Sequence, residues 1–112
     1  MTTPTIDDEI INFQLAYQML TKKQQKIFDY LHWFGNKFQV AAPSQTRIAL
    51  FVGCRVATVS DAIKKFRELG LIATMPLKKG WSRLVYMISN AILSLDLKKP
   101  STWFRRIKIG GG

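Results

Sequence analysis

The sequence predicts a mainly α-helical domain with one small β-hairpin, and three observations support this fold class. Apolar residues recur at the spacing of an amphipathic helix in four consecutive segments between residues 5 and 69. Gly53 and Gly70 stand where two of these segments end, as glycines often do at helix C-termini. Two β-rich runs then flank the turn-forming segment Pro76–Gly80, which predicts a hairpin. A chain of 112 residues is long enough for one domain with a single modest core.

The first predicted helix covers residues 5–20. Thr5 is placed to cap it, and the acids in its first turn suit the positive end of the helix dipole. Its apolar residues recur at spacings of four and three: Ile6, Ile10, Phe13, Tyr17 and Leu20. This seam is too short for a convincing coiled coil. Two interpretations stay open, because the helix can pack on its own domain or form a homodimer interface.

A capping box marks the start of the second predicted helix. Thr21 and Gln24 have the N-cap and N3 spacing of this motif, so a new helix is expected directly after Thr21. Its expected buried stripe is Gln24, Ile27, Leu31, Phe34 and Phe38. The pair Gly35–Asn36 is expected to fray this helix or end it early. His32 has no Cys or carboxylate companions, so we expect a surface or satisfied interior histidine and not a metal ligand.

The third and fourth predicted helices meet at a tight corner. Pro43 and Ser44 mark the start of the third helix, with Ser44 as its N-cap, and Gly53 supplies the left-handed conformation of the corner. The buried stripe of the third helix is expected to be Ile48, Ala49 and Val52. The buried face of the fourth is expected to be Val59, Ala62, Ile63, Phe66 and Leu69. This pattern is typical of a helix-turn-helix, whose second helix lies in a DNA major groove.

The predicted hairpin follows Gly70. Its strands are expected within Leu71–Met75 and Trp81–Ile88, and the turn between them carries two lysines. Because side chains alternate along a strand, one set in the second strand should face the core: Leu84, Tyr86 and Ile88.

Residues Ile48–Ile88 resemble a winged helix-turn-helix DNA-binding domain. The residues that carry this resemblance are Ile48, Ala49, Gly53, Ala57–Ser60, Ala62, Ile63, Phe66, Leu69–Ile72 and Arg83–Tyr86. The run Leu20–Leu31 is similar to the first helix of bacterial repressors, including the SOS-response repressor, and to winged-helix modules of plasmid and phage replication proteins. The resemblance covers residues 20–88. It implies a three-helix core plus a wing, with an extra N-terminal helix (5–20) and a C-terminal extension (89–112), in one domain of residues 1–112.

The resemblance implies that the fourth helix reads base edges with its N-terminal part and contacts phosphates with its later cations. The residues expected at the DNA are Arg55, Val56, Ala57, Thr58, Ser60, Asp61, Lys64 and Lys65. Relatives often have Ser or Thr where this chain has Arg55, and a basic residue where it has Asp61. Asp61 either accepts from a cytosine amino group or pairs with Arg55 or Lys65. An alternative helix start would make Thr58 the N-cap.

Two further groups are expected at the DNA by the same resemblance. The start of the third helix contributes Ser44, Gln45 and Thr46. The wing contributes Lys78, Lys79, Trp81 and Arg83. Lysines at the tip of a hairpin suit phosphate neutralisation, and an arginine suits either the backbone or a narrow minor groove.

The segment after residue 88 leaves several alternatives open. Ser89 or Asn90 can cap a short helix that runs to Leu97, whereas alternating leucines would suit a strand: Leu93, Leu95 and Leu97. The basic, aromatic tail Trp103–Ile109 can fold back on the core, contact DNA or bind a partner. A homodimer formed through this extension is therefore a second alternative, beside a homodimer formed through the N-terminal helix.

Composition agrees with a polyanion-binding domain. The net charge is +10 and the isoelectric point is near 10.1, so nucleic acid is the leading partner class, with acidic membrane or protein surfaces next. Cys54 is the only cysteine, which rules out an internal disulfide and a thiolate zinc site. We expect the Cys54 side chain to pack in the core at the corner between the third and fourth predicted helices.

No catalytic pattern is present in the sequence. It lacks a Gly-rich phosphate loop, a nucleophile–His–acid set and an HExxH motif, and its seven carboxylates are dispersed. We therefore expect neither enzyme activity, nor a cofactor, nor a metal site. The first residues do not have the basic and then apolar pattern of a secretory leader, and no apolar run is long enough to span a bilayer. A cytoplasmic location without membrane contact is expected.

The function expected from the sequence is sequence-specific binding of double-stranded DNA, as a transcription regulator or a plasmid or phage replication factor. The recognition helix would lie in the major groove, and the basic wing on the backbone or in the minor groove. The alternative is a winged helix that docks an acidic protein partner without touching DNA. RNA binding is a weaker third class, because no aromatic platform for single strands is evident in the sequence.

Overall fold

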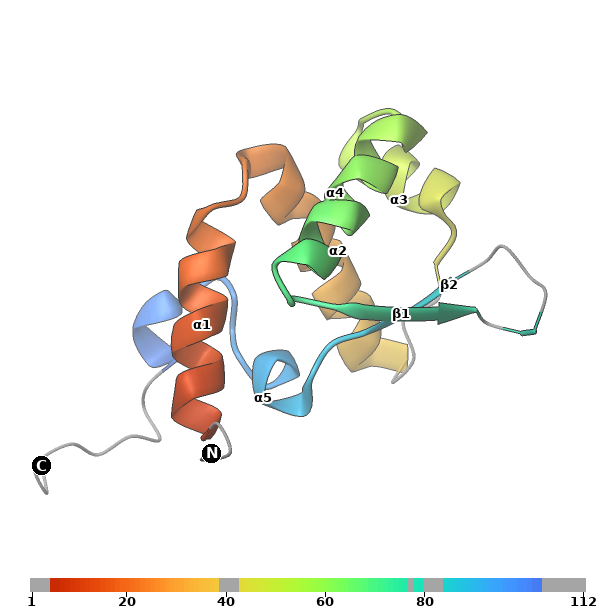
Figure 1. Cartoon of the computed structure of the whole chain (residues 1–112). Coiled ribbons are helices and arrows are strands. Elements are labelled where there is room, and N and C mark those ends of the chain that lie inside the picture. The colour runs from red at the N-terminus through yellow and green to blue at the C-terminus, as the bar shows by residue number, and fades with distance from the viewer. Residues whose placement is uncertain (1–4, 39–42, 77, 80–83, 104–112) are drawn as a thin grey trace, which may run out of the picture.

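The computed structural model describes residues 5–38, 43–76, 78–79 and 84–103. Their elements, in chain order, are α1 (Ile6–Gln18), α2 (Lys22–Phe38), α3 (Gln45–Val52), α4 (Val56–Glu68), β1 (Ala73–Pro76), β2 (Leu84–Met87), α5 (Asn90–Leu93) and the 3₁₀ turn η1 (Pro100–Thr102). The expected fold class of helices with a small hairpin is confirmed (Figure 1).

Helix α2 is the centre of the packing. It contacts α3, α4 and α5, and α3 packs directly on α4 (Figure 1). The largest fully buried side chains come from α2, α3 and α4 and from the residue before the N-cap of α3: Ile27, Phe28, Leu31, Pro43, Ile48, Val59 and Phe66. The expected buried faces of α3 and α4 are confirmed, since Val52 and Leu69 are the only members that stay partly exposed among the described residues.

Helix α1 starts as predicted and packs on its own domain. Thr5 accepts a hydrogen bond from the Asp8 backbone at 3.2 Å, and the Asp8 carboxylate accepts one from the Thr5 backbone at 3.1 Å. Most of the expected seam is buried, and Phe13 stacks on Phe28 with ring centroids 5.5 Å apart. The Tyr17 hydroxyl donates to Asp29 of α2 at 2.7 Å. These contacts use the seam within one chain and so support the intramolecular interpretation of it.

The capping box of α2 is confirmed, but the expected end of the helix is wrong. Thr21 and Gln24 exchange side-chain-to-backbone hydrogen bonds at 3.0 and 3.2 Å. The helix continues through Gly35 to Phe38, and Gly35 is buried. Asn36 sustains this last part, because its side-chain amide donates to the Leu93 carbonyl of α5 at 2.9 Å. Phe38 was expected inside, yet half of its side chain is exposed.

His32 is a buried, satisfied histidine, as expected. Its Nε2 lies 2.8 Å from the Ile92 carbonyl oxygen and donates to it, since a carbonyl can only accept. Removal of the ring from water lowers the pKa of His32, although the bond to Ile92 opposes this shift. The neutral ring therefore ties α2 to α5.

The two helices predicted to end at a glycine, α3 and α4, do so. Ser44 caps α3 by accepting from the Arg47 backbone at 3.1 Å, and Gly53 ends α3 with φ +80°. Helix α4 begins at Val56, which excludes the later start with Thr58 as N-cap. Gly70 ends α4 with φ +73°, and the following Leu71 N–H reaches back to the Phe66 carbonyl at 2.8 Å. This is the hydrogen-bond pattern of a Schellman motif.

The hairpin is antiparallel with a register that pairs Ala73 with Met87 and Pro76 with Leu84. Tyr86 is buried, and the other two residues of the expected inward set pack partly buried against the core: Leu84 and Ile88. The first strand starts later than predicted. The residues expected to begin it, Leu71 and Ile72, are buried in the connection from α4.

The segment after β2 folds back on the core. Ser89 caps α5, which confirms a short helix, but the helix ends at Leu93 and not at Leu97. The Trp103 indole is buried, donates to the Asp96 carbonyl at 2.7 Å and packs on Phe13 at a centroid distance of 5.3 Å. The start of the tail therefore packs on α1, while residues 104–112 lie outside the described part.

Candidate nucleic-acid interface

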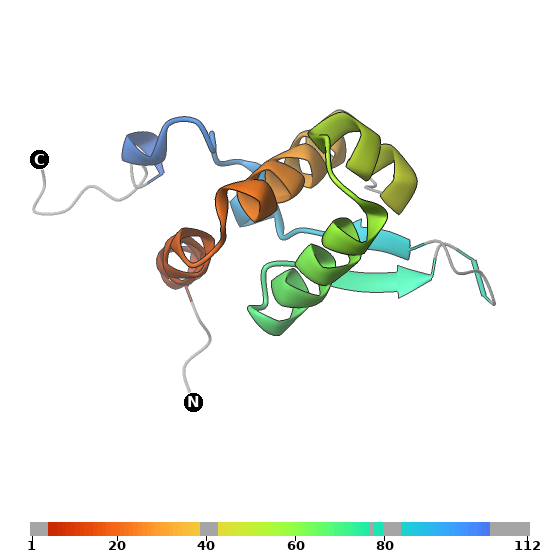
Figure 2. The same cartoon turned by 90° about the horizontal axis from the view of Figure 1, so that it is seen from above.

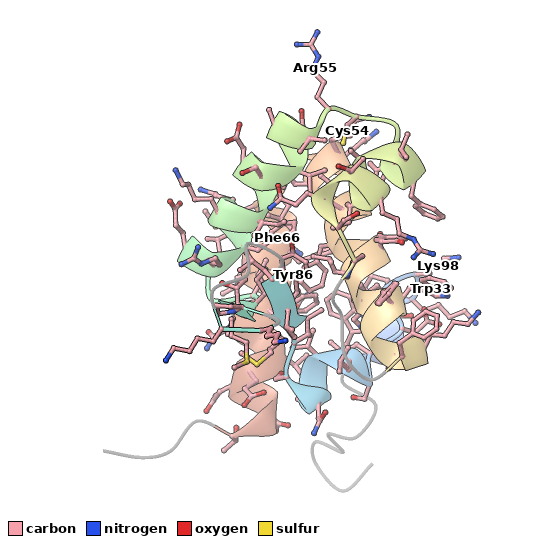
Figure 3. The ribbon with its side chains drawn as sticks, turned by 90° about the vertical axis from the view of Figure 1, so that its right-hand side faces the viewer. Trp33, Cys54, Arg55, Phe66, Tyr86 and Lys98 are labelled. Carbon is pink, nitrogen blue, oxygen red and sulfur yellow. The ribbon has the colours of Figure 1, made fainter. Side chains whose placement is uncertain are left out.

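The candidate interface is built on the outer side of α4. The helix buries one face in the core and leaves its N-terminal half projecting from the molecule, with Arg55 pointing away from the body (Figure 3). The predicted contact residues divide by exposure. Thr58 and Lys65 are half-buried at the flanks of this helix. The exposed ones are Arg55, Val56, Ala57, Ser60, Asp61 and Lys64.

The first turn of α4 has no side-chain cap. Arg55 occupies the N-cap position with extended backbone angles, but its side chain makes no capping hydrogen bond. The first backbone N–H groups of a helix have no partner within the helix, and the dipole concentrates positive potential there. A phosphate oxygen is a suitable acceptor at such an end.

Charges along α4 are mixed. From Arg55 to Glu68 the chain carries four cations (Arg55, Lys64, Lys65 and Arg67) and two acids (Asp61 and Glu68). The spacing of i, i+4, i+7 and i+11 places four residues on the most outward stripe: Ala57, Asp61, Lys64 and Glu68. Phosphates are therefore expected beside this stripe, where Lys65 and Arg67 lie on opposite flanks. The sequence interpretation did not use Glu68, although this spacing places it there.

The start of α3 is the second group of predicted contact residues. The hydroxyl oxygen of Ser44 accepts the capping hydrogen bond from the Arg47 backbone and keeps its O–H as a donor. Gln45 is half-buried and Thr46 is exposed. Arg47, which the sequence interpretation did not include, is exposed beside them and lies 6.0 Å from the Phe34 ring centroid.

The hairpin extends from the C-terminal end of α4 (Figure 1). Two buried residues, Leu71 and Ile72, fix the connection between helix and strand. Lys78 and Lys79 are exposed in the turn, as predicted. The other two predicted wing residues, Trp81 and Arg83, lie outside the described residues.

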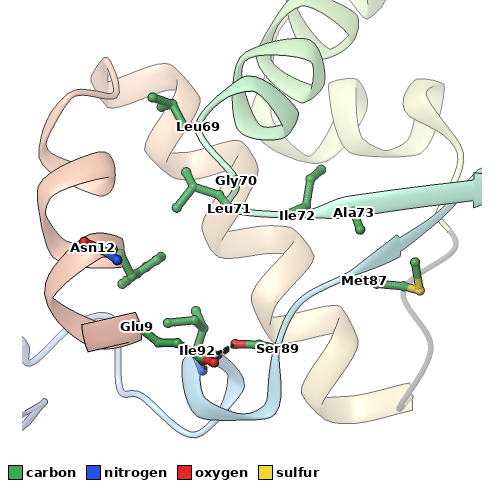
Figure 4. Close-up of a pocket in the computed structure, with 11 residues that line it drawn as sticks. Glu9, Asn12, Leu69, Gly70, Leu71, Ile72, Ala73, Met87, Ser89 and Ile92 are labelled. Atoms are coloured by element: carbon green, nitrogen blue, oxygen red, sulfur yellow. Dashed lines mark hydrogen bonds between the residues drawn. The ribbon is translucent and has the colours of Figure 1, made fainter. Parts of the chain in front are cut away.

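A hollow of about 660 Å³ lies between α1 and the α4–β1 connection (Figure 4). Of the described residues that line it, Glu9 alone is charged, and the Ser89 hydroxyl donates to the Glu9 carboxylate at 3.3 Å. A single carboxylate with no cation repels phosphate, so this hollow does not belong to a nucleic-acid interface.

A second exposed surface, which we call the aromatic face, lies on α2 and α3. Its exposed apolar residues are Trp33, Phe38, Leu50 and Phe51. Charged residues border it: Lys26, Asp29 and Lys98 line a hollow of about 420 Å³ together with Trp33 and Phe51, and Lys37 lies over the Trp33 ring. Figure 3 shows Trp33 and Lys98 close together and well away from Arg55. The sequence interpretation did not anticipate this face.

The shifted ionisable groups lie away from α4. Burial raises the pKa of the Tyr17 phenol, and its hydrogen bond to Asp29 adds to the shift. Withdrawal from water also raises the pKa of Asp29, against the opposing effect of the Tyr17 bond. Both groups belong to the α1–α2 contact and have a structural role there.

Within the described ranges, no group of three or more His, Cys, Asp or Glu side chains is arranged to hold a metal ion. None of the helices described is long and apolar enough to cross a membrane. The chain matches no protein-family model, and neither a curated protein nor a solved structure proved similar to it. Its function is therefore inferred from its own geometry.

Proposed function

We propose that this chain is a winged helix-turn-helix protein that binds double-stranded DNA in a sequence-specific manner. Helix α4 lies in the major groove, and the β1–β2 turn follows the backbone or the minor groove. The observation that carries the proposal is the α3–Gly53–α4 corner, which leaves the uncapped N-terminal half of α4 exposed and leads into a hairpin with two exposed lysines. A helix and a hairpin of this kind together match two adjacent grooves of a duplex.

Affinity comes mainly from phosphate contacts. Five cations lie on the outward stripe of α4, on its flanks and in the turn: Lys64, Lys65, Arg67, Lys78 and Lys79. Each neutralised phosphate contributes a slope of about −0.9 in log K against log salt, so five contacts give about −4 to −5. The net charge of +10 also accelerates the encounter with DNA.

Sequence discrimination comes from the first two turns of α4. Arg55 offers a bidentate donor for guanine, Ser60 a hydroxyl for base edges, and Asp61 an acceptor for the cytosine amino group. One bidentate contact discriminates by about 1–3 kcal/mol. One copy of α4 with these contacts therefore binds its site with modest affinity. The same contacts serve a transcription regulator or a plasmid or phage replication factor.

The test is a selection of bound duplexes from a random pool, followed by titration of the selected duplex at two salt concentrations. The expected result is an enriched motif and binding that weakens with the slope given above. An acidic protein partner in place of DNA is the second candidate, because Asp61 and Glu68 on the outward stripe of α4 repel phosphates while the cations on its flanks attract acidic side chains. Absence of salt-sensitive duplex binding would refute the first candidate in favour of the second.

A further inference from the structure

The aromatic face contains two adjoining hollows between α2 and α3. The hollow of about 420 Å³ described above is lined by Tyr30, Trp33 and Phe51. The same three residues line a neighbouring hollow of about 370 Å³, together with Arg47 and Leu50. Because the two hollows share these residues, they form one groove, which we call the aromatic groove. Figure 2 shows α3 beside α2, at the opposite edge of the molecule from α1.

The apolar side chains of the aromatic groove are unusually exposed. The exposed fractions are 79% for Leu50, 72% for Phe51 and 50% for Trp33. Single exposed apolar residues are common on protein surfaces, but a contiguous group marks a contact surface. Large rings that line a hollow are also the side chains that anchor protein–protein contacts.

Four cations border the aromatic groove. Two of them lie at the ends of the α2 stripe that carries its rings, because positions 26, 30, 33 and 37 follow helical spacing. A third comes from α3, and the fourth from the segment after α5. These cations are Lys26, Lys37, Arg47 and Lys98.

The charge around the groove selects the chemistry of its partner. Asp29 is the one acid among the described residues that line the two hollows, and its carboxylate accepts the hydrogen bond from Tyr17 at 2.7 Å. Four cations against one hydrogen-bonded carboxylate attract an acidic partner.

The rings of the groove are stacked within the chain. Phe51 lies 4.6 Å from Tyr30 between ring centroids, and the Lys37 ammonium lies over the Trp33 ring at 5.1 Å. A nucleobase binds by stacking on an open ring face. An apolar side chain needs only a hollow to fill, so the groove favours a protein partner over single-stranded nucleic acid.

The chain itself does not supply an acidic cover for this face. Residues 104–112 contain three cations and no acid. A second copy that used the same face would bring like charges together, which costs free energy. The partner is therefore expected to be a different protein.

We propose that the aromatic groove binds an acidic amphipathic helix of another protein. Its apolar side chains fill the two hollows, and its carboxylates lie beside the four bordering cations. Recognition of a helix in a groove uses apolar residues at positions i, i+3 or i+4, and i+7. Because Trp33 and Lys98 lie well away from Arg55 (Figure 3), the proposal does not depend on whether α4 binds DNA.

The first test is a selection from a displayed library of random peptides of about 16 residues on the immobilised full chain. Peptides that also bind the Leu50→Glu variant, which has an added carboxylate in the groove, are removed. The expected survivors have a net negative charge and apolar residues three and four positions apart. No survivors, or survivors that are neutral or basic, would overturn the proposal.

The second test measures the affinity of one selected, fluorescein-labelled peptide by anisotropy at about 0.15 M salt, where distant charges are screened. Leu50→Glu should weaken binding at least tenfold, whereas Leu15→Glu makes the same change on α1 and should have no effect. Lys98→Glu should weaken binding about 3- to 10-fold, whereas Lys64→Glu on α4 should not. All four side chains are exposed, so circular dichroism should report an unchanged fold. Equal losses within either pair would overturn the proposal.

The third test measures three other occupants with the Leu50→Glu and Leu15→Glu variants. A second copy is measured by sedimentation equilibrium, a single strand of thymidines by anisotropy, and vesicles of phosphatidylcholine and phosphatidylserine by cosedimentation. The two variants should behave alike in each experiment. Binding at least tenfold weaker in Leu50→Glu alone would assign the groove to that occupant and overturn the proposal.

Discussion

The corner at Gly53 allows a quantitative test of how the candidate recognition helix is held. Gly53 has φ +80°, and a Cβ built on it meets no heavy atom within 4 Å. Substitution by alanine therefore costs only the left-handed backbone conformation, about 1–2 kcal/mol. Alanine also lowers the conformational entropy of the unfolded chain, which stabilises the folded state. This gain is smaller than the cost where the native backbone conformation is unfavourable for alanine.

Gly70 supplies an internal control, because it has φ +73° and equally open surroundings. Gly53→Ala and Gly70→Ala should lower the free energy of unfolding by similar amounts in urea titrations. Gly53→Asn should cost less, since asparagine tolerates the left-handed region. A loss of 4 kcal/mol or more, or no loss at all, in Gly53→Ala would refute the conformational explanation. Well below the melting temperature, duplex affinity of the folded fraction should stay unchanged.

The remaining predictions concern DNA contacts, pH and the C-terminal segment. Lys64→Ala should weaken binding to all duplexes and reduce the slope of log K against log salt by about 0.9. Thr58→Ala should instead alter sequence preference. Both effects are measured on panels of duplexes at two salt concentrations. Because burial lowers the pKa of His32, the unfolded state binds more protons below pH ~6.5, and stability should fall as the pH drops through that region. His32→Gln keeps a donor for the Ile92 carbonyl and should show a smaller difference between pH 7.5 and pH 5 in urea unfolding; an equal difference would exclude His32 as its source. Trp103→Ala removes a buried indole and its 2.7 Å hydrogen bond, and should cost about 3–5 kcal/mol in the same assay; a cost below 1 kcal/mol would mean that the tail does not pack on α1.

Local sequence patterns predicted the helix starts well. Thr5, Thr21 and Ser44 each cap a helix as expected, because a cap depends on groups three residues apart in the chain. The left-handed ends at Gly53 and Gly70 follow for the same local reason.

The end of α2 was predicted wrongly because the deciding partner is remote in sequence. Gly35–Asn36 favours an early end when only neighbours are considered. Asn36 instead donates to Leu93, which lies 57 positions later, and this contact extends the helix. The buried state of His32 depends on the same segment, through the Ile92 carbonyl.

The candidate interface was predicted in part. Helical spacing correctly separated the buried face of α4 from its exposed residues, but it was not applied to Glu68, which joins the outward stripe. The aromatic face escaped prediction because Trp33 and Phe51 come from different helices, and only their packing brings them beside one hollow.

The sequence by itself determined where the helices begin, where glycine turns the chain and which face of α4 is apolar. These properties depend on contacts within one turn of helix or on spacing along one element. Only the tertiary structure decided where the predicted seam of α1 packs, because its spacing suits the core of its own domain and a second copy equally well. Phe13 and Tyr17 contact aromatic partners on α2 and in Trp103, so this side of α1 is covered within one chain.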